Sequence, residues 1–131
     1  MMGLDTNVLV RYIMQDDAKQ AAKATKLIES LSPDAPGFVT LVSVIELVWV
    51  LSSCFGLTRE QIAQALNALL RAKQLVVDQA DQVVRALRTY SSSSADFADC
   101  LIERTASSAG CAKTMTFDVA ASKQAGMTLI Q

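Results

Sequence analysis

Short apolar segments alternate with longer segments of helical periodicity along the whole of this chain, and that alternation is the feature that most limits its fold. Strands separated by helices pair in parallel, because each crossover carries the chain back to the same end of the sheet. We therefore expect an α/β fold, a three-layer sandwich whose central parallel sheet of about four to five strands is flanked by helices. The segments with strand character are the residues up to Asp5, which we expect to be buried, and residues 38–41, 75–77, 113–117 and 127–130.

Capping residues and chain breakers mark where the expected helices begin and end. The segment "PDAPGF", residues 33–38, breaks the chain after the second helix. The expected helices are one directly after Asp5; one over residues 16–31, capped by Asp16 or Asp17; one over residues 44–51, with Ser43 and Glu46 as a capping box; one over residues 59–73, with Thr58 and Gln61 as a capping box; one that starts at Asp78 or Gln79 and runs to residue 90; one that contains Asp96 and Asp99, capped by Ser93; and a brief one near residues 119–124.

The composition is that of one domain rich in small aliphatic residues. A chain of 131 residues is most simply a single domain over residues 1–131, able to bury about two-thirds of its unfolded surface. Hydrophobic residues make up 51% and aromatic residues 5%, which suits helices packed on a buried sheet. The longest apolar stretch is interrupted by Glu46 and is too short to span a bilayer, and the N-terminus lacks a charged leader. We therefore expect a soluble, cytoplasmic protein.

The chain contains no histidine, which excludes every mechanism that uses imidazole as a base or a zinc ligand. Its three cysteines, Cys54, Cys100 and Cys111, have no paired spacing and predict reduced thiols. Twelve basic residues stand against 13 acidic ones, and they are scattered, so charge alone does not indicate a nucleic-acid binder. Any catalysis has to use carboxylates, amides, hydroxyls or a metal ion.

Two aspartates stand three residues apart in the segment "SSADFADCLIE". On a helix, Asp96 and Asp99 would share a face with their Cβ atoms about 5–6 Å apart, where two carboxylates repel each other by about 3 kcal/mol at an effective dielectric of about 20. The pair is therefore either solvated or gathered around a cation. In the solvated case, Asp96 lies in the first turn behind a Ser93 cap, and Glu103 continues an ordinary wet face.

Four acids fall at the same end of the expected sheet. Asp5 and Asp118 each end a predicted strand, Glu46 opens the helix after another strand, and Asp99 lies early in a helix. Ligands of an open parallel sheet bind at the carboxyl ends of its strands. Taken singly, these acids could be helix caps, except that Glu46 lies among the apolar residues 44–50, so we expect it to be buried, which is costly for an unpaired carboxylate. Their conjunction favours a shared metal site.

Four short motifs resemble a known family. The segments "GLDTNVLV", "SVIELVWVL", "SADFADCLIE" and "MTFD", in this order and at this separation, resemble the PIN-domain family, and particularly the VapC toxins of bacterial toxin–antitoxin pairs. The resemblance covers essentially the whole chain and implies a Mg²⁺- or Mn²⁺-dependent endoribonuclease with a small α/β domain. The site residues that it implies are Asp5, Glu46, Asp99 and Asp118 as catalytic and metal-binding acids, Asp96 as an acid beside them, and Thr6, Asn7 and Thr116 as polar residues around them.

The chemistry of such a site also follows from the residue types. Oxygen ligands alone select hard cations such as Mg²⁺. Ions of this kind lower the pKa of bound water and neutralise charge on a phosphodiester. An acid cluster without histidine can therefore cleave RNA.

The resemblance also implies partners: an RNA substrate, a small cognate antitoxin protein that covers an apolar groove beside the site, and a second copy in a homodimer. The apolar excess in residues 21–31 and 41–55 indicates an interface. Trp49 is a candidate anchor for it, although core packing is the simpler expectation. The alternative function is a non-catalytic α/β interaction module whose acids are helix caps and solvated surface. A phosphatase of the haloacid dehalogenase type ranks behind both, because Asn7 replaces its second aspartate.

Overall fold

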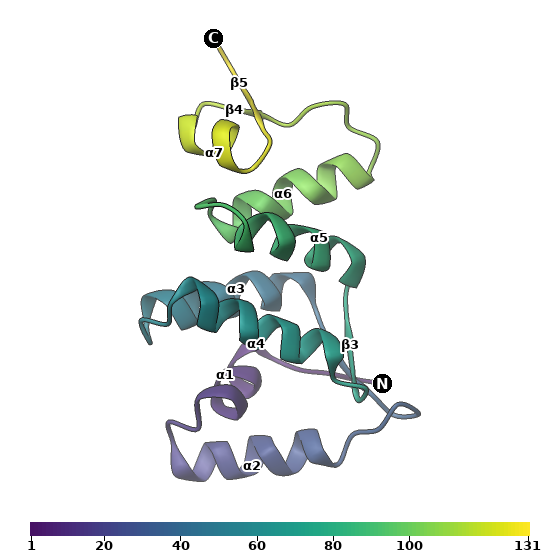
Figure 1. Cartoon of the computed structure of the whole chain (residues 1–131). Coiled ribbons are helices and arrows are strands. Elements are labelled where there is room, and N and C mark those ends of the chain that lie inside the picture. Colours follow the sequence, from purple (N-terminus) through teal and green to yellow (C-terminus); the bar gives the residue numbers. More distant parts are fainter. The chain divides into compact units, whose positions relative to one another are not determined.

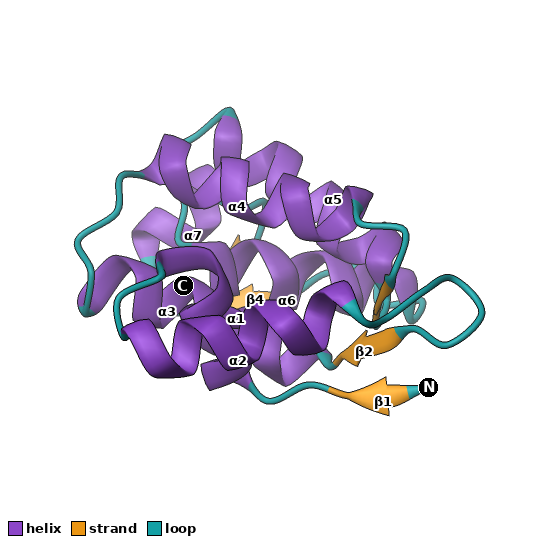
Figure 2. Ribbon diagram, turned by 90° about the horizontal axis from the view of Figure 1, so that it is seen from below, coloured by secondary structure: helices purple, strands orange, loops and turns teal.

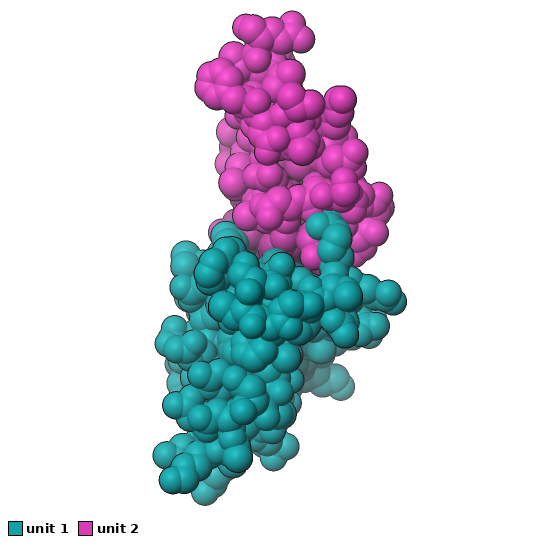
Figure 3. Space-filling view, turned by 90° about the vertical axis from the view of Figure 1, so that its left-hand side faces the viewer, with its two compact units in different colours: residues 1–78 teal, residues 79–131 magenta.

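The computed structural model describes all residues from Met1 to Gln131, and most of them are helical (Figure 1). The strands are short beside the helices (Figure 2). The chain divides into two compact units, residues 1–78 and residues 79–131, which are coloured separately in Figure 3. None of the helices combines the length and the apolar character that a membrane-spanning segment requires.

The first unit alternates strands and helices in the order that the sequence predicts. Its three strands form one parallel sheet in the order β1–β2–β3, in which Gly37 of the middle strand pairs with Met2 on one side and Leu75 on the other. Its elements are β1 (Met2–Gly3), α1 (Thr6–Met14), α2 (Ala18–Glu29), β2 (Gly37–Val39), α3 (Leu41–Ser53), α4 (Arg59–Arg71) and β3 (Leu75–Val77).

The middle strand begins with a glycine because two leucines close over it. A Cβ atom at Gly37 would lie 2.8 Å from the side chains of both Leu4 and Leu31, which is closer than carbon atoms pack. The missing side chain therefore lets these leucines cover the sheet directly.

The core of the first unit is aliphatic and lies where its helices pack together and on the sheet. Helix α1 packs against α2 and α3, and α4 packs against β3. Each helix turns one stripe of apolar residues inward, as their spacing of three and four predicts. The buried side chains include Leu9, Val10, Ile28, Val39, Val44, Leu47, Leu51, Ile62 and Leu66.

The second unit consists of a helix pair and a small parallel sheet. The two long helices pack on each other, and the rings of Tyr90 and Phe97 meet edge to face with their centroids 5.7 Å apart. The sheet pairs Met115 with Thr128, and a short helix connects its two strands. The elements are α5 (Ala80–Ser91), α6 (Phe97–Ser108), β4 (Met115–Thr116), α7 (Val119–Gln124) and β5 (Thr128–Leu129).

The expected α/β fold with parallel strands is confirmed, since every strand pair in both units is parallel. The strands divide into a three-stranded and a two-stranded sheet, where we expected one sheet. They are short because the next helix begins at once: its N-cap follows the strand end within two residues at Asp5, Thr40 and Asp118. The single domain over residues 1–131 stays a prediction.

The first strand is more exposed than expected. Met2 retains 49% of its accessible surface, because β1 is an edge strand that pairs only with β2. The prediction of a buried strand before Asp5 is therefore wrong, although Leu4 directly after it is buried.

Two expected helix caps are confirmed. Asp17 caps α2, and its Oδ1 accepts a hydrogen bond from the N–H of Gln20 at 2.9 Å. Thr58 and Gln61 form the reciprocal capping box of α4, with bonds of 2.9 and 3.1 Å.

Helix α3 begins earlier than the sequence analysis predicts. Its N-cap is Thr40, whose hydroxyl accepts a hydrogen bond from the N–H of Ser43 at 3.1 Å. The predicted capping box of Ser43 and Glu46 is therefore wrong, and Ser43 is the buried third residue of the helix. Threonine caps a helix nearly as well as serine, so the sequence offered two candidate caps three residues apart.

Helix α6, by contrast, begins later than predicted. Its N-cap is Asp96, whose Oδ2 accepts a hydrogen bond from the N–H of Asp99 at 3.2 Å. The predicted cap, Ser93, instead donates its hydroxyl to the carbonyl oxygen of Thr89 at 2.7 Å, at the end of the preceding helix. Asp99 consequently lies in the first turn of α6, where the helix dipole favours an acid.

Candidate active site

Asp5 stands at the junction of strand β1 and helix α1. It is the N-cap of α1, and its Oδ1 accepts a hydrogen bond from the N–H of Thr6 at 2.9 Å. The capping role that the sequence left open for Asp5 is therefore real. The cap uses only one carboxylate oxygen, and the second remains available to a ligand.

Glu46 lies on the solvent side of helix α3. The prediction that it is buried is wrong, because the apolar residues around it in the sequence belong to two different faces of the helix. Its carboxylate is nevertheless held in place, since Oε1 accepts a hydrogen bond from the hydroxyl of the buried Thr6. The buried face of α3 consists of Ser43, Val44, Leu47 and Leu51.

Asp5 and Glu46 line one pocket of about 360 Å³ in the first unit. Thr6 and Asn7, two of the polar residues that the family resemblance implies, line the same pocket. The remaining lining is apolar and comes from the last turns of α3, through Trp49 and Val50. The first unit thus brings together two of the four predicted acids and two of their predicted polar neighbours.

In the second unit, Asp118 is placed by a turn between strand β4 and helix α7. Its N–H donates to Oγ1 of Thr116 at 3.0 Å, and its Oδ1 accepts from the N–H of Ala120 at 2.9 Å. Asp118 is therefore the N-cap of α7. The hydroxyl of Thr116 thus fixes the backbone two residues further on, at Asp118.

Asp99 is the acid whose environment disfavours its charge. Partial burial raises the pKa of Asp99 above its ordinary value, and the negative charges of Asp96 and Asp118 raise it further. Asp99 thus lies near enough to Asp96 and to Asp118 to feel the negative charge of each.

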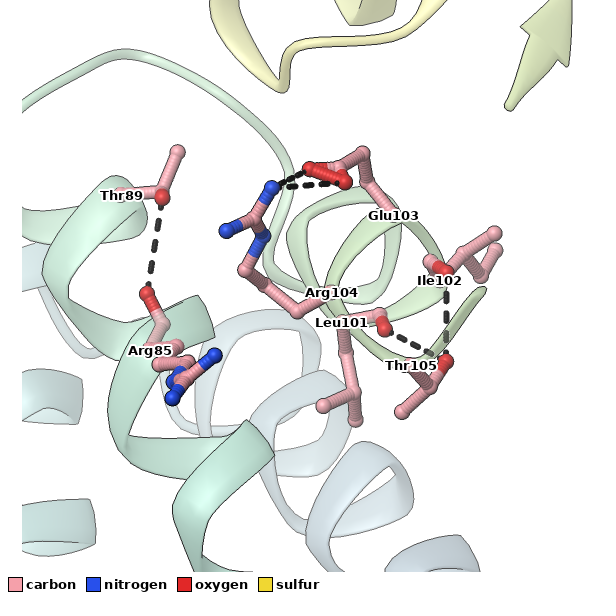
Figure 4. A network of polar contacts seen from close by, with 7 residues as sticks. All are labelled: Arg85, Thr89, Leu101, Ile102, Glu103, Arg104 and Thr105. Atoms are coloured by element: carbon pink, nitrogen blue, oxygen red, sulfur yellow. Dashed lines mark hydrogen bonds and ion pairs between the residues drawn. The ribbon is translucent and has the colours of Figure 1, made fainter. Parts of the chain in front are cut away.

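Glu103 does not belong with these acids. We expected it on the same solvated face of α6 as Asp96 and Asp99, but it is only 7% exposed. Its carboxylate forms an ion pair with the neighbouring Arg104, whose Nη2 lies 2.8 Å from Oε2 (Figure 4). A Cβ atom at position 126, which Gly126 lacks, would lie 3.6 Å from Oε1 of the same carboxylate. Glu103 therefore has a structural partner that the sequence pattern did not reveal.

The predicted acids form one set in each unit. Asp5 and Glu46 meet in the first unit, and Asp99 and Asp118 interact in the second. Within neither unit do three or more metal-ligating side chains gather into a group that could hold a metal ion. Both sets offer only oxygen donors, which fits a hard divalent cation. That the two sets share one ion stays a prediction.

The comparison with family models decides the family. The model of the PIN domain matches residues 2–126. The chain belongs to the PIN domain family. Neither the curated proteins nor the solved structures gave a match to the chain.

PIN domains are in general nucleases, and they usually use divalent metal ions. Membership of the PIN domain family therefore indicates a hydrolase that acts on nucleic acids.

Two features of this PIN domain were missed in the sequence. The first is that Thr40 and Ser43 extend the polar contacts of Thr6. The only sequence signal for these contacts is the spacing of three residues between Thr40, the N-cap of α3, and Ser43, the third residue of that helix. Trp49, for which we expected core packing, is 61% exposed. Its spacing from Val42 and Ile45 forms a second apolar stripe on α3, which a helical projection of the sequence would have shown.

Proposed function

We propose that this PIN domain is a Mg²⁺-dependent endoribonuclease and the toxin of a VapBC-type toxin–antitoxin pair. The observation that carries the proposal is the pocket lined by Asp5, Thr6, Asn7 and Glu46. Its two carboxylates come from elements far apart in the sequence, and both accept a hydrogen bond from Thr6: Asp5 from the backbone N–H and Glu46 from the hydroxyl. Helix capping explains why Asp5 is held, but it does not explain a hydroxyl directed at Glu46.

Asp5, Glu46, Asp99 and Asp118 would hold Mg²⁺, or Mn²⁺ in its place. The chemistry that such an ion would supply there is activation of a water molecule and neutralisation of charge on the phosphodiester. The residues of the chain itself keep the ligands in position: the N-terminus of α1 holds Asp5, Thr6 holds Glu46, and Thr116 orients Asp118. Asn7 offers an amide to the substrate from the wall of the pocket. Asp96 acts through its charge on Asp99 and not as a ligand.

An antitoxin and a second copy of the chain are the proposed protein partners, in the cytoplasm. The support comes from a pocket of about 450 Å³ on α3, lined by Val42, Ile45, Glu46 and Trp49. Val42 and Trp49 there are 72% and 61% exposed. Apolar groups gathered in this way on a protein surface indicate an interaction site. A partner seated on this face would also touch Glu46.

The rival function, a non-catalytic interaction module, has an observation in its favour. Asp5, Asp96 and Asp118 all cap helices, so each has a structural reason to be present. An interaction module gives no reason for the hydrogen bond from Thr6 to Glu46, or for the raised pKa of Asp99 beside Asp96 and Asp118. A nuclease accounts for both.

The test is cleavage of structured cellular RNAs by the purified protein with and without Mg²⁺, followed by mapping of the new ends. We expect Asp5→Asn to lower the rate by at least about 100-fold, since it removes a proposed ligand while asparagine still caps the helix. Asp17→Asn is the matched control, because Asp17 is the N-cap of α2, as Asp5 is of α1, and lies outside the pocket.

Asp96→Asn should lower the rate much less than Asp99→Asn. Full activity in Asp5→Asn, or equal losses in Asp5→Asn and Asp17→Asn, would refute the assignment of the site.

A further inference from the structure

Hydroxyl groups form a chain that leads from the start of helix α3 to the carboxylate of Glu46. Thr40 Oγ1 lies 3.2 Å from Ser43 Oγ, and Ser43 Oγ lies 3.3 Å from Thr6 Oγ1. Thr6 Oγ1 in turn is hydrogen-bonded to Oε1 of Glu46. Thr6 and Ser43 are 4% and 7% exposed. The hydroxyls of Thr6 and Ser43 are therefore shielded from water, which would otherwise compete for these hydrogen bonds.

Only one arrangement of the hydroxyl protons makes a hydrogen bond of every contact from Thr40 to Glu46. An ionised carboxylate can only accept, so Thr6 donates its proton to Glu46. Thr6 then has only lone pairs left, so Ser43 donates to Thr6 and Thr40 donates to Ser43. The position of the Thr40 hydroxyl is fixed as well, because its Oγ1 accepts a hydrogen bond from the N–H of Ser43 at 3.1 Å. Each hydroxyl donates once and accepts once, and such chains reinforce their members.

Of the three hydroxyl residues, Ser43 is the one whose presence nothing else in the fold explains. It is not the cap of α3, which is Thr40. A buried hydroxyl in a helix costs free energy unless it is hydrogen-bonded, and alanine is the better helix former. The one benefit that the serine brings is its pair of contacts with Thr40 and Thr6.

We propose that Ser43 is a positioning residue of the candidate active site. By donating to Thr6 it directs the hydroxyl proton of Thr6 at Glu46, and so holds that carboxylate at the pocket it shares with Asp5. The value of this orientation for metal binding rests on the proposed nuclease function, whereas the orientation itself does not.

The first experiment observes the hydroxyl proton of Thr6 by NMR in the full-length, metal-free protein. This proton should exchange slowly with water in the wild type and in Ser43→Thr, which keeps the hydroxyl. In Ser43→Ala its exchange should accelerate by about threefold to tenfold, the effect of losing one net hydrogen bond. Ser53→Ala makes the same change at an exposed position of the same helix and should leave the exchange rate unaltered.

Two results of this experiment would overturn the proposal: an unprotected Thr6 hydroxyl in the wild type, or equal protection in Ser43→Ala and the wild type. If Ser43→Ala does not fold, Ser43→Cys takes its place, because a thiol fills similar space and donates only weakly.

The second experiment measures Mn²⁺ binding to the same variants by titration calorimetry. Residues that orient metal ligands typically change affinity by about 10- to 100-fold, and we expect about tenfold weaker binding in Ser43→Ala, with wild-type affinity in Ser43→Thr and Ser53→Ala. Unchanged affinity in Ser43→Ala would overturn its role at the site. Absence of Mn²⁺ binding in the wild type would instead refute the proposed nuclease function, and the Thr6 proton alone would then decide the role of Ser43.

Discussion

At Asp5, helix capping and metal binding are compatible within one carboxylate. Oδ1 accepts the N–H of Thr6, which fixes the side chain, and the second oxygen is left for a ligand. Asp118 follows the same pattern, with Oδ1 on the N–H of Ala120. A helix cap is thus a means of holding a ligand rigidly, as a functional site requires. For this reason, finding that an acid is a cap does not argue against its being a ligand.

Asp99 provides a residue-scale prediction about pH. Its pKa is raised, first by burial and then by Asp96 and Asp118, so the folded protein keeps this proton at pH values where the unfolded chain has released it. Stability therefore falls as the pH rises from the ordinary aspartate pKa of about 3.9 through the raised value. Asp99→Asn should stabilise the metal-free protein above this interval, by less than about 1 kcal/mol because Asp99 is partly exposed, and not below it.

Urea unfolding of Asp99→Asn and the wild type across the acid-to-neutral range measures this difference in the free energy of unfolding. A difference that does not depend on pH would show that the ionisation of Asp99 is not its cause.

Among the secondary-structure elements, helix α3 is unusual in having two apolar faces, one buried in the core and one exposed to solvent. Leu47 is fully buried, whereas Trp49 is 61% exposed. Leu47→Ala should therefore cost about 2–5 kcal/mol of the free energy of unfolding. Trp49→Ala should change it by less than about 0.5 kcal/mol. Chemical denaturation of both variants measures the contrast. If Trp49→Ala lowered the free energy of unfolding as much as Leu47→Ala, Trp49 would belong to the core and the proposed interface would be refuted.

The start of a helix was predictable where only one nearby residue could serve as its N-cap. Thr58 with Gln61 leaves no competitor nearby, and that helix starts where predicted. Thr40 competes with Ser43, and Asp96 competes with Ser93, and in both cases the prediction was wrong. The choice depends on tertiary contacts: Ser43 is buried against Thr6 and cannot cap.

At the scale of the whole molecule, the α/β fold was predictable because strand and helix signals alternate without interruption. The grouping of strands into sheets was not, since it depends on pairing between residues far apart in the chain. For the candidate site, the sequence predicted that four acids would come together, and two of them, Asp5 and Glu46, line one pocket with Asn7, which the family resemblance implied. It could not predict the exposure of Glu46 or the burial of Glu103, because both depend on which helix face meets the core.

The central proposal for the site is that Asp5, Glu46, Asp99 and Asp118 hold one divalent ion. Its most direct test is a Mn²⁺ titration by calorimetry of the wild type, Asp5→Asn, Asp99→Asn and the double variant. If the ligands share an ion, each single change should remove the same binding event and the double variant should lose nothing further, so the effects are far from additive. Binding that survives in both single variants, or independent losses that add in the double variant, would show that these acids do not share an ion.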